Sequence, residues 1–132
     1  MKYVYAQLKG GLGNQLFIYA HARSISLNQN RKLVLDTFSG FINDDKYKRT
    51  YELDKFCISP DYIISDDKSV FSRKVLKIVS LVLSRCLPKA FKFYLAESSL
   101  EFDRVWLDCG IRSKYLYIDG YWQSEKYFRS IK

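Results

Sequence analysis

A cluster of glycines between a short β-rich run and a helix-length segment limits how this chain can fold more than any other feature. The β-rich run is Val4–Leu8, and the glycines that end it lie within Gly10–Gly13. Leu16–Gln29 follows without glycine or proline and is long enough for a helix, and Leu33–Leu35 is typical of a second strand. Because this order begins a βαβ unit, we expect an α/β fold whose parallel sheet carries helices on its faces.

The rest of the chain adds fewer elements. Residues 69–87, followed by Pro88, predict a second, amphipathic helix, and Tyr115–Asp119 predicts a third strand. Tyr51–Phe56 is typical of either a helical turn or a loop, and Gly120–Phe128 of a turn or the start of a helix. With 132 residues, 48% of them apolar, the chain has the size and composition of one globular domain.

Positive charge is concentrated in one stretch of the chain. The net charge is +8, and Lys68–Ala96 contains basic but no acidic residues. The helix predicted over 69–87 has an apolar arc of Val75, Ile78, Val79, Val82, Leu83 and Cys86 opposite a cationic face of Arg73, Lys74, Lys77 and Arg85. Such a helix suits either docking on an anionic membrane surface or packing on the sheet with its lysines in water. Nucleic acid is not expected, because no binding motif accompanies the charge.

A glycine-rich turn between a strand and a helix is a common place to hold phosphate, because backbone N–H groups point at the anion and missing Cβ atoms let it approach. The dinucleotide pattern GxGxxG fails here, since Leu16 stands at its third glycine, although Asp36 lies near the place of the ribose-binding acid. The Gly-Lys-Ser/Thr of a P-loop is absent from the sequence. A tight turn without a ligand is the alternative. Asn14 and Gln15 favour an anion site, because their amides place directional donors beside it.

These residues resemble a known family. Gly10–Phe17 with Tyr19, Ala20 and Arg23, then Leu33–Asp36, Tyr51–Phe56 and Gly120–Phe128, resemble in sequence and order the α-1,2-fucosyltransferase family, glycosyltransferase family 11. The resemblance implies a Rossmann-like N-terminal lobe of a GT-B-like glycosyltransferase. It also implies a metal-independent, inverting transfer of L-fucose from GDP-fucose to a galactose hydroxyl of a glycan acceptor.

The resemblance further implies site residues. Gly11, Gly13, Asn14 and Gln15 would line the cleft where donor pyrophosphate and acceptor meet. Tyr121–Gln123 suits sugar recognition and equally suits a packed strand end.

The family's second signature, a His-x-Arg-Arg-Gly-Asp motif whose arginine neutralises the departing GDP, does not occur in residues 1–132. His21–Arg23 matches only the His-x-Arg part of this motif and lies inside the expected first helix. We expect a helix-packing histidine and a surface arginine there. No catalytic residue is assigned, because Asp36, Asp54 and Asp119 have no partner that the sequence identifies and are more typical of loops and caps. We therefore expect residues 1–132 to form a single lobe, the N-terminal part of a longer two-lobe transferase, and to be inactive alone.

The cysteines bear on location. Cys57, Cys86 and Cys109 are odd in number and widely spaced, which predicts a reducing compartment and neither a disulfide framework nor a zinc site. With no signal peptide or membrane span recognised, we expect a cytoplasmic chain, and docking of helix 69–87 on the inner membrane face is the alternative to its packing on the sheet. The rival function is a non-catalytic basic module that binds a membrane surface or nucleic acid.

Overall fold

The chain folds around a parallel β-sheet. The computed structural model describes residues 1–66, 75, 78–80, 82–83, 86, 88, 91–97, 99, 101–102 and 111–129. Within these residues the sheet has five strands in the order β3-β2-β1-β5-β4, and every neighbouring pair is parallel. The strands are β1 (Lys2–Gln7), β2 (Arg31–Asp36), β3 (Tyr62–Ile64), β4 (Tyr94–Ala96) and β5 (Tyr115–Asp119).

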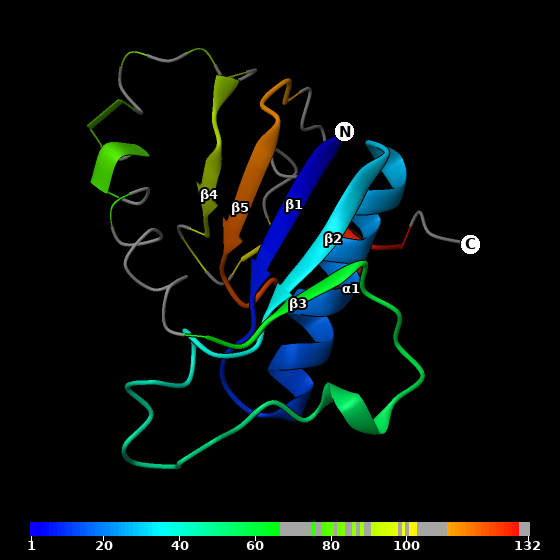
Figure 1. The fold of residues 1–132 in the computed structure, drawn as a ribbon, viewed down its shortest axis with the longest axis vertical. Helices are drawn as coiled ribbons and strands as arrows, with labels where there is room; N and C mark the ends of the chain where they lie inside the picture. The colour runs from blue at the N-terminus through cyan, green and yellow to red at the C-terminus, as the bar shows by residue number, and fades with distance from the viewer. Residues whose placement is uncertain are drawn as a thin grey trace.

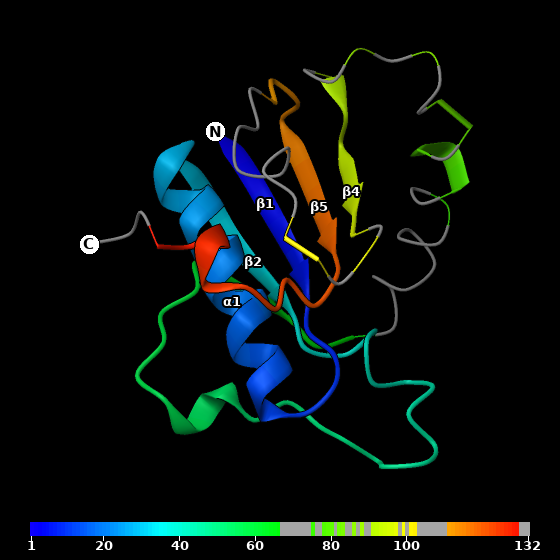
Figure 2. The same ribbon diagram turned by 180° about the vertical axis from the view of Figure 1, so that it is seen from behind.

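One helix covers one face of this sheet. Helix α1 (Leu12–Asn28) connects β1 to β2 and lies across them, as Figure 2 shows from the helix side and Figure 1 from the opposite side. Two short 3-10 turns, η1 (Leu53–Lys55) and η4 (Glu125–Tyr127), contact α1 at its flanks. The buried residues of α1 recur at helical spacing, including Ile18, Ala22 and Ile25, which explains why this segment is a helix that packs on a flat surface.

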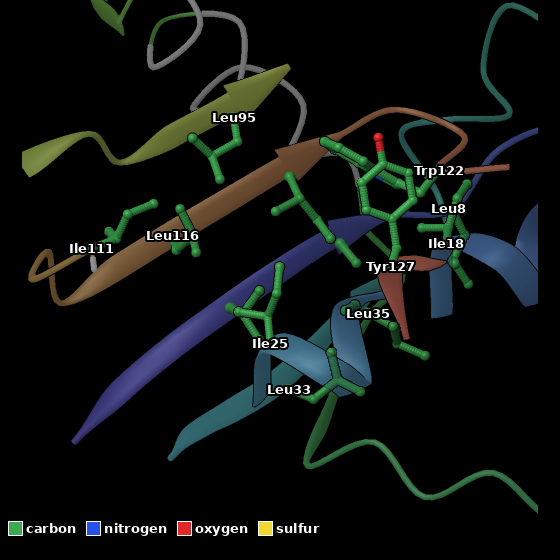
Figure 3. Packing of buried hydrophobic residues seen from close by; sticks show 14 of the residues in the cluster. Leu8, Ile18, Ile25, Leu33, Leu35, Leu95, Ile111, Leu116, Trp122 and Tyr127 are labelled. Carbon is green, nitrogen blue, oxygen red and sulfur yellow. The ribbon is translucent and has the colours of Figure 1, made fainter. Parts of the chain in front are cut away.

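The core lies between α1 and the strands. In β1, Val4 and Ala6 are fully buried and alternate with tyrosines, as expected for a strand whose two faces meet different surroundings. Figure 3 shows Leu33 and Leu35 of β2 beside Ile25 of the helix. Burial of each such side chain stabilises the fold by about 1.5–3 kcal/mol.

The opposite face of the sheet is rich in tyrosine. Tyr5 and Tyr117, paired across β1 and β5, stack with ring centroids 4.5 Å apart, and Tyr3 and Tyr115 stack at 5.7 Å. Tyr62 at the β3 edge is 51% exposed. In Figure 1 this face is turned toward the viewer.

The fold class predicted from the sequence is confirmed: the chain is α/β, with a parallel sheet and the form of a Rossmann-like lobe. Two details differ. The helix begins at Leu12 instead of near Leu16, because the glycine loop itself forms the first turn. The edge strands β3 and β4 were not predicted, since runs of three residues carry almost no periodic signal. Most of the helix predicted over 69–87 lies outside the described residues.

Candidate functional site

The site begins with the glycine loop at the carboxyl end of β1. Gly10 has a φ of +75°, and a Cβ there would lie 2.6 Å from Nδ2 of Asn14, so this position needs glycine for both backbone and space. Gly11 and Gly13 differ from it, because a Cβ on either would have no neighbouring atom within 4 Å among the described residues. Their missing side chains therefore leave open space outside the loop.

The N-terminus of α1 faces this open space. Gly11 is the residue before the helix, and among the described residues no side chain accepts a hydrogen bond from the first turn, which also lacks an acidic residue. An uncapped helix end presents backbone N–H groups and a partial positive charge. The loop therefore has the geometry and electrostatics of an anion site.

Gln15 lies beneath the loop. Its side chain is fully buried, and its Nε2 donates to the carbonyls of Gly10 at 3.0 Å and Thr50 at 2.9 Å. Its Oε1 accepts from the backbone N–H of Glu52 at 3.0 Å. The amide thus joins the glycine loop to the chain that precedes η1. A direct contact between Gln15 and a substrate stays a prediction.

Asn14 links the glycine loop to the segment after β5. Nε2 of Gln123 donates to Oδ1 of Asn14 at 2.6 Å, and both side chains are accessible to solvent. The link spans the point where the strand order turns, because β2 lies on one side of β1 and β5 on the other. In open α/β sheets this point, outside the carboxyl ends of the strands, is where ligands bind.

The segment after β5 is held in an unusual backbone conformation. Trp122 has a φ of +54° and is fully buried, so its backbone lies in the left-handed region that favours glycine. The carboxylate of Glu97 accepts the N–H of Tyr121 at 2.6 Å and that of Trp122 at 3.1 Å. Glu97 therefore stabilises the turn that directs Gln123 toward Asn14.

The tryptophan packs on the histidine of α1. The ring centroids of His21 and Trp122 lie 4.4 Å apart, and those of His21 and Tyr127 lie 4.9 Å apart (Figure 3 shows Trp122 and Tyr127). Burial lowers the pKa of the imidazole to about 4, against a smaller opposing effect of the Tyr127 backbone. His21 is neutral at pH 7 and packs in the core, which confirms the helix-packing role expected for it.

A charged cluster lies beside the loop. Nζ of Lys9 is 2.6 Å from Oδ1 of Asp119, and the hydroxyl of Tyr94 donates to Oδ2 at 2.7 Å. The same ammonium group lies 5.0 Å from the ring centre of Tyr121. This cluster places an ammonium group, paired with a carboxylate, at the same edge of the sheet as the helix N-terminus.

The structure brings together three of the four predicted site residues. Gly11, Gly13 and Asn14 lie at the open end of α1, whereas the side chain of Gln15 is turned inward. Of the Tyr121–Gln123 block, Trp122 is a core residue and Gln123 faces the site. The roles of Glu97 and Lys9 were missed, because nothing in the sequence near either residue identifies its partner.

Asp36 has the capping role expected from the sequence, whereas Asp119 has side-chain partners, Lys9 and Tyr94, that the sequence did not identify. Asp36, the last residue of β2, is buried and accepts the N–H groups of Phe38 and Ser39 in the loop that follows, both at 2.9 Å. Within the described part of the chain, no group of three histidine, cysteine or acidic side chains could hold a metal ion.

The cationic face predicted for helix 69–87 lies outside the described residues. All six members of its apolar arc are described and exposed: Cys86, and at 39–70% Val75, Ile78, Val79, Val82 and Leu83. Among the described residues, no helix is both long and apolar enough to cross a membrane. Cys57 and Cys86 are free and exposed.

Comparison with known proteins adds one relative. The chain is 32% identical over 130 residues to an alpha-1,2-colitosyltransferase of Escherichia coli. The chain is similar to part of a glycosyltransferase. The match includes 97% of this chain and 41% of the relative, so the chain spans about two-fifths of that enzyme's length. No family model and no solved structure matches.

Proposed function

We propose that this chain is the N-terminal, Rossmann-like lobe of a GT-B-like glycosyltransferase that moves L-fucose from GDP-fucose to a galactose hydroxyl of a glycan, with inversion and without a metal ion. The observation that carries the proposal is the uncapped N-terminus of α1, with open space at Gly11 and Gly13. The similarity to an enzyme that transfers colitose in an α-1,2 linkage supports the same linkage chemistry.

In this proposal the glycine loop binds the pyrophosphate of the donor. Three N–H groups of the first helical turn, from Leu12 to Asn14, are free to bond phosphate oxygens, because the helix ladder begins with the N–H of Gln15 bonding to the carbonyl of Gly11. The Asn14–Gln123 pair then lies beside the anion and offers amide groups to sugar hydroxyls. Lys9 adds positive charge nearby, although Asp119 compensates part of it.

Gly13→Ala tests the proposal without disturbing the fold. The added methyl group enters open space, and alanine is a better helix former than glycine, so stability is expected to stay level or rise by up to about 1 kcal/mol. Calorimetric titration with GDP is expected to show at least tenfold weaker binding, because the methyl group occupies the approach of the phosphate. Asn28→Ala at the other end of α1 is the matched control. Equal GDP affinity in both variants contradicts a phosphate site at this loop.

Residues 1–132 alone are expected to be inactive as a transferase, because the sequence contains no His-x-Arg-Arg-Gly-Asp motif to neutralise the departing GDP. An assay with GDP-fucose and a β-galactoside, with the colitosyl donor in parallel, measures this. Transfer of either sugar well above background would overturn the expectation.

A second candidate function is docking on an anionic membrane surface. One observation favours it: the described apolar residues of segment 69–87, such as Ile78 at 62% and Val82 at 70%, are exposed. A helix with such a face and flanking lysines binds lipid surfaces. Sedimentation with vesicles of phosphatidylglycerol and phosphatidylcholine tests this. Absence of binding at low salt would exclude it.

A further inference from the structure

A pocket lies in the loop that follows β2. The chain between β2 and η1 forms the loop Thr37–Tyr51, drawn in teal at the carboxyl edge of the sheet in Figure 1. It lines an open pocket of about 410 Å³, within the range of small-molecule sites. Aromatic and aliphatic groups of Phe38, Phe41 and Ile42 line it together with charged and hydroxyl side chains.

The first end of this loop is fixed to the strands. Oδ1 of Asp36 accepts the N–H groups of Phe38 and Ser39, and its Oδ2 accepts the Ser39 hydroxyl. Nε2 of Gln7 at the end of β1 donates to the same hydroxyl oxygen at 2.8 Å. Gly40 comes so close to the carbonyl of Leu8 that a Cβ would lie 2.0 Å from that oxygen. The loop therefore begins in close contact with the end of β1 and with Leu8, just before the glycine loop.

The second end is fixed to the helix. Gln15 bonds the carbonyl of Thr50 and the N–H of Glu52 from its buried position in the first turn of α1. One residue thus holds both the anion site and the far end of the pocket. The distance between the anion site and the pocket is therefore set by the fold. An enzyme that joins two substrates needs their sites at such a fixed distance.

The polar groups of the pocket are also held in place. Oδ1 of Asp44 accepts the N–H of Tyr47 at 3.3 Å, and its Oδ2 lies 3.8 Å from Nε of Arg49. The guanidinium of Arg49 stacks over the ring of Tyr47 at 4.2 Å. A carboxylate and a guanidinium in fixed positions give acceptor and donor groups to a ligand beside the apolar wall.

We propose that this pocket binds a neutral hexopyranose, the terminal sugar of the acceptor glycan. A sugar ring has an apolar C–H face, which suits the wall formed by Phe38, Phe41 and Ile42, and hydroxyls that suit Asp44 and Arg49. Carboxylate and cation are both present, so the pocket selects for neither anions nor cations. The acceptor role rests on the proposed glycosyltransferase function, whereas the sugar site itself does not.

The test is a titration of the ¹⁵N-labelled chain with methyl β-galactoside, followed by amide chemical shifts. We expect shifts at Phe38, Ile42 and Thr50 with millimolar affinity. Ile42→Asp is expected to weaken binding at least tenfold, and because Ile42 is 45% exposed this change does not threaten the fold. Tyr115→Ala, which removes an aromatic ring that is 44% exposed on the sheet, is the matched control and is expected to change nothing.

GDP titrated separately distinguishes the two sites. If GDP shifts Gly11–Asn14 but the galactoside shifts nothing, the sugar pocket is wrong and the proposed donor site stands. If the galactoside binds and GDP does not, the sugar pocket stands and the proposed donor site is wrong. Shifts at Phe38 and Ile42 caused by GDP and not by the galactoside would overturn the proposal in favour of a nucleoside pocket.

Discussion

Asn14 and Gln123 lie 109 positions apart in the sequence, yet their side-chain amides are joined by a hydrogen bond of 2.6 Å. The bond connects the first turn of α1 to the segment after β5, over the point where the strand order reverses. It joins the two loops of the candidate site, together with the contact of Lys9 on the ring of Tyr121.

Asn14→Ala and Gln123→Ala are therefore expected to have coupled effects. Each change is expected to weaken GDP binding by about three- to tenfold, and the double variant is expected to be no weaker than the more affected single one, because both remove the same bond. Both side chains are accessible to solvent, so the free energy of unfolding is expected to change by less than about 1 kcal/mol. Calorimetric titration of the three variants measures the coupling. Fully additive losses would show that the bond does not link the loops functionally.

Gln15→Leu is expected to destabilise the chain. The change leaves the buried carbonyl of Gly10 and two part-buried groups, the carbonyl of Thr50 and the N–H of Glu52, without their partner. The expected loss of unfolding free energy is about 2–4 kcal/mol, measured by urea denaturation. Gln123→Leu makes the same chemical change at an exposed position and serves as the control. Equal stability of the two variants would contradict the stabilising role of the hydrogen bonds that Gln15 makes between the glycine loop and the chain before η1.

The stability of the chain is expected to fall on mild acidification because of His21. Its pKa is about 4 in the folded chain, below the ordinary value of 6.5, so the unfolded chain binds a proton more readily. The contribution of neutral His21 to the free energy of unfolding is complete above pH 6.5 and is lost as the pH falls toward 4. The free energy of unfolding then falls by up to about 1.4 kcal/mol per pH unit. His21→Phe keeps the aromatic packing and all carboxylates, so urea denaturation should show a smaller decline from pH 7 to pH 5. Parallel declines in both proteins would exclude His21 as the cause.

Glu97→Ala is expected to release the turn at Trp122. The carboxylate bonds two consecutive N–H groups and supports a left-handed backbone that costs about 1–3 kcal/mol. In a Trp106→Phe background, where Trp122 is the one remaining tryptophan, its emission should shift to the red as the ring meets water. Glu97→Gln retains one acceptor oxygen and should shift the emission less. Identical spectra in all three proteins would contradict the role of Glu97.

The sequence predicted the local part of the site better than its long-range part. Gly11, Gly13 and Asn14 follow directly from the order of strand, loop and helix, so their position at the helix N-terminus could be predicted. The inward direction of Gln15 could not, because it depends on the loop at Thr50 that packs against the helix. The fold shows the same division, since β1, β2 and β5 were predicted and the short edge strands β3 and β4 were not.

The contact between Asn14 and Gln123 illustrates the limit of sequence reasoning. It depends on β5, and not β4, being the strand next to β1, and strand order is decided by packing across the whole sheet. The left-handed backbone of Trp122 is a similar case, because a bulky residue rarely adopts it without support from elsewhere, here from Glu97.

An amide-resolved titration measures whether the glycine loop binds the pyrophosphate of a nucleotide sugar. The ¹⁵N-labelled chain is titrated with GDP and, separately, with guanosine. We expect GDP to shift the amides of Leu12, Gly13 and Asn14 and guanosine to leave them unchanged, because the phosphates make the contact. Unchanged amides at saturating GDP, or equal shifts with both ligands, would contradict pyrophosphate binding at this loop.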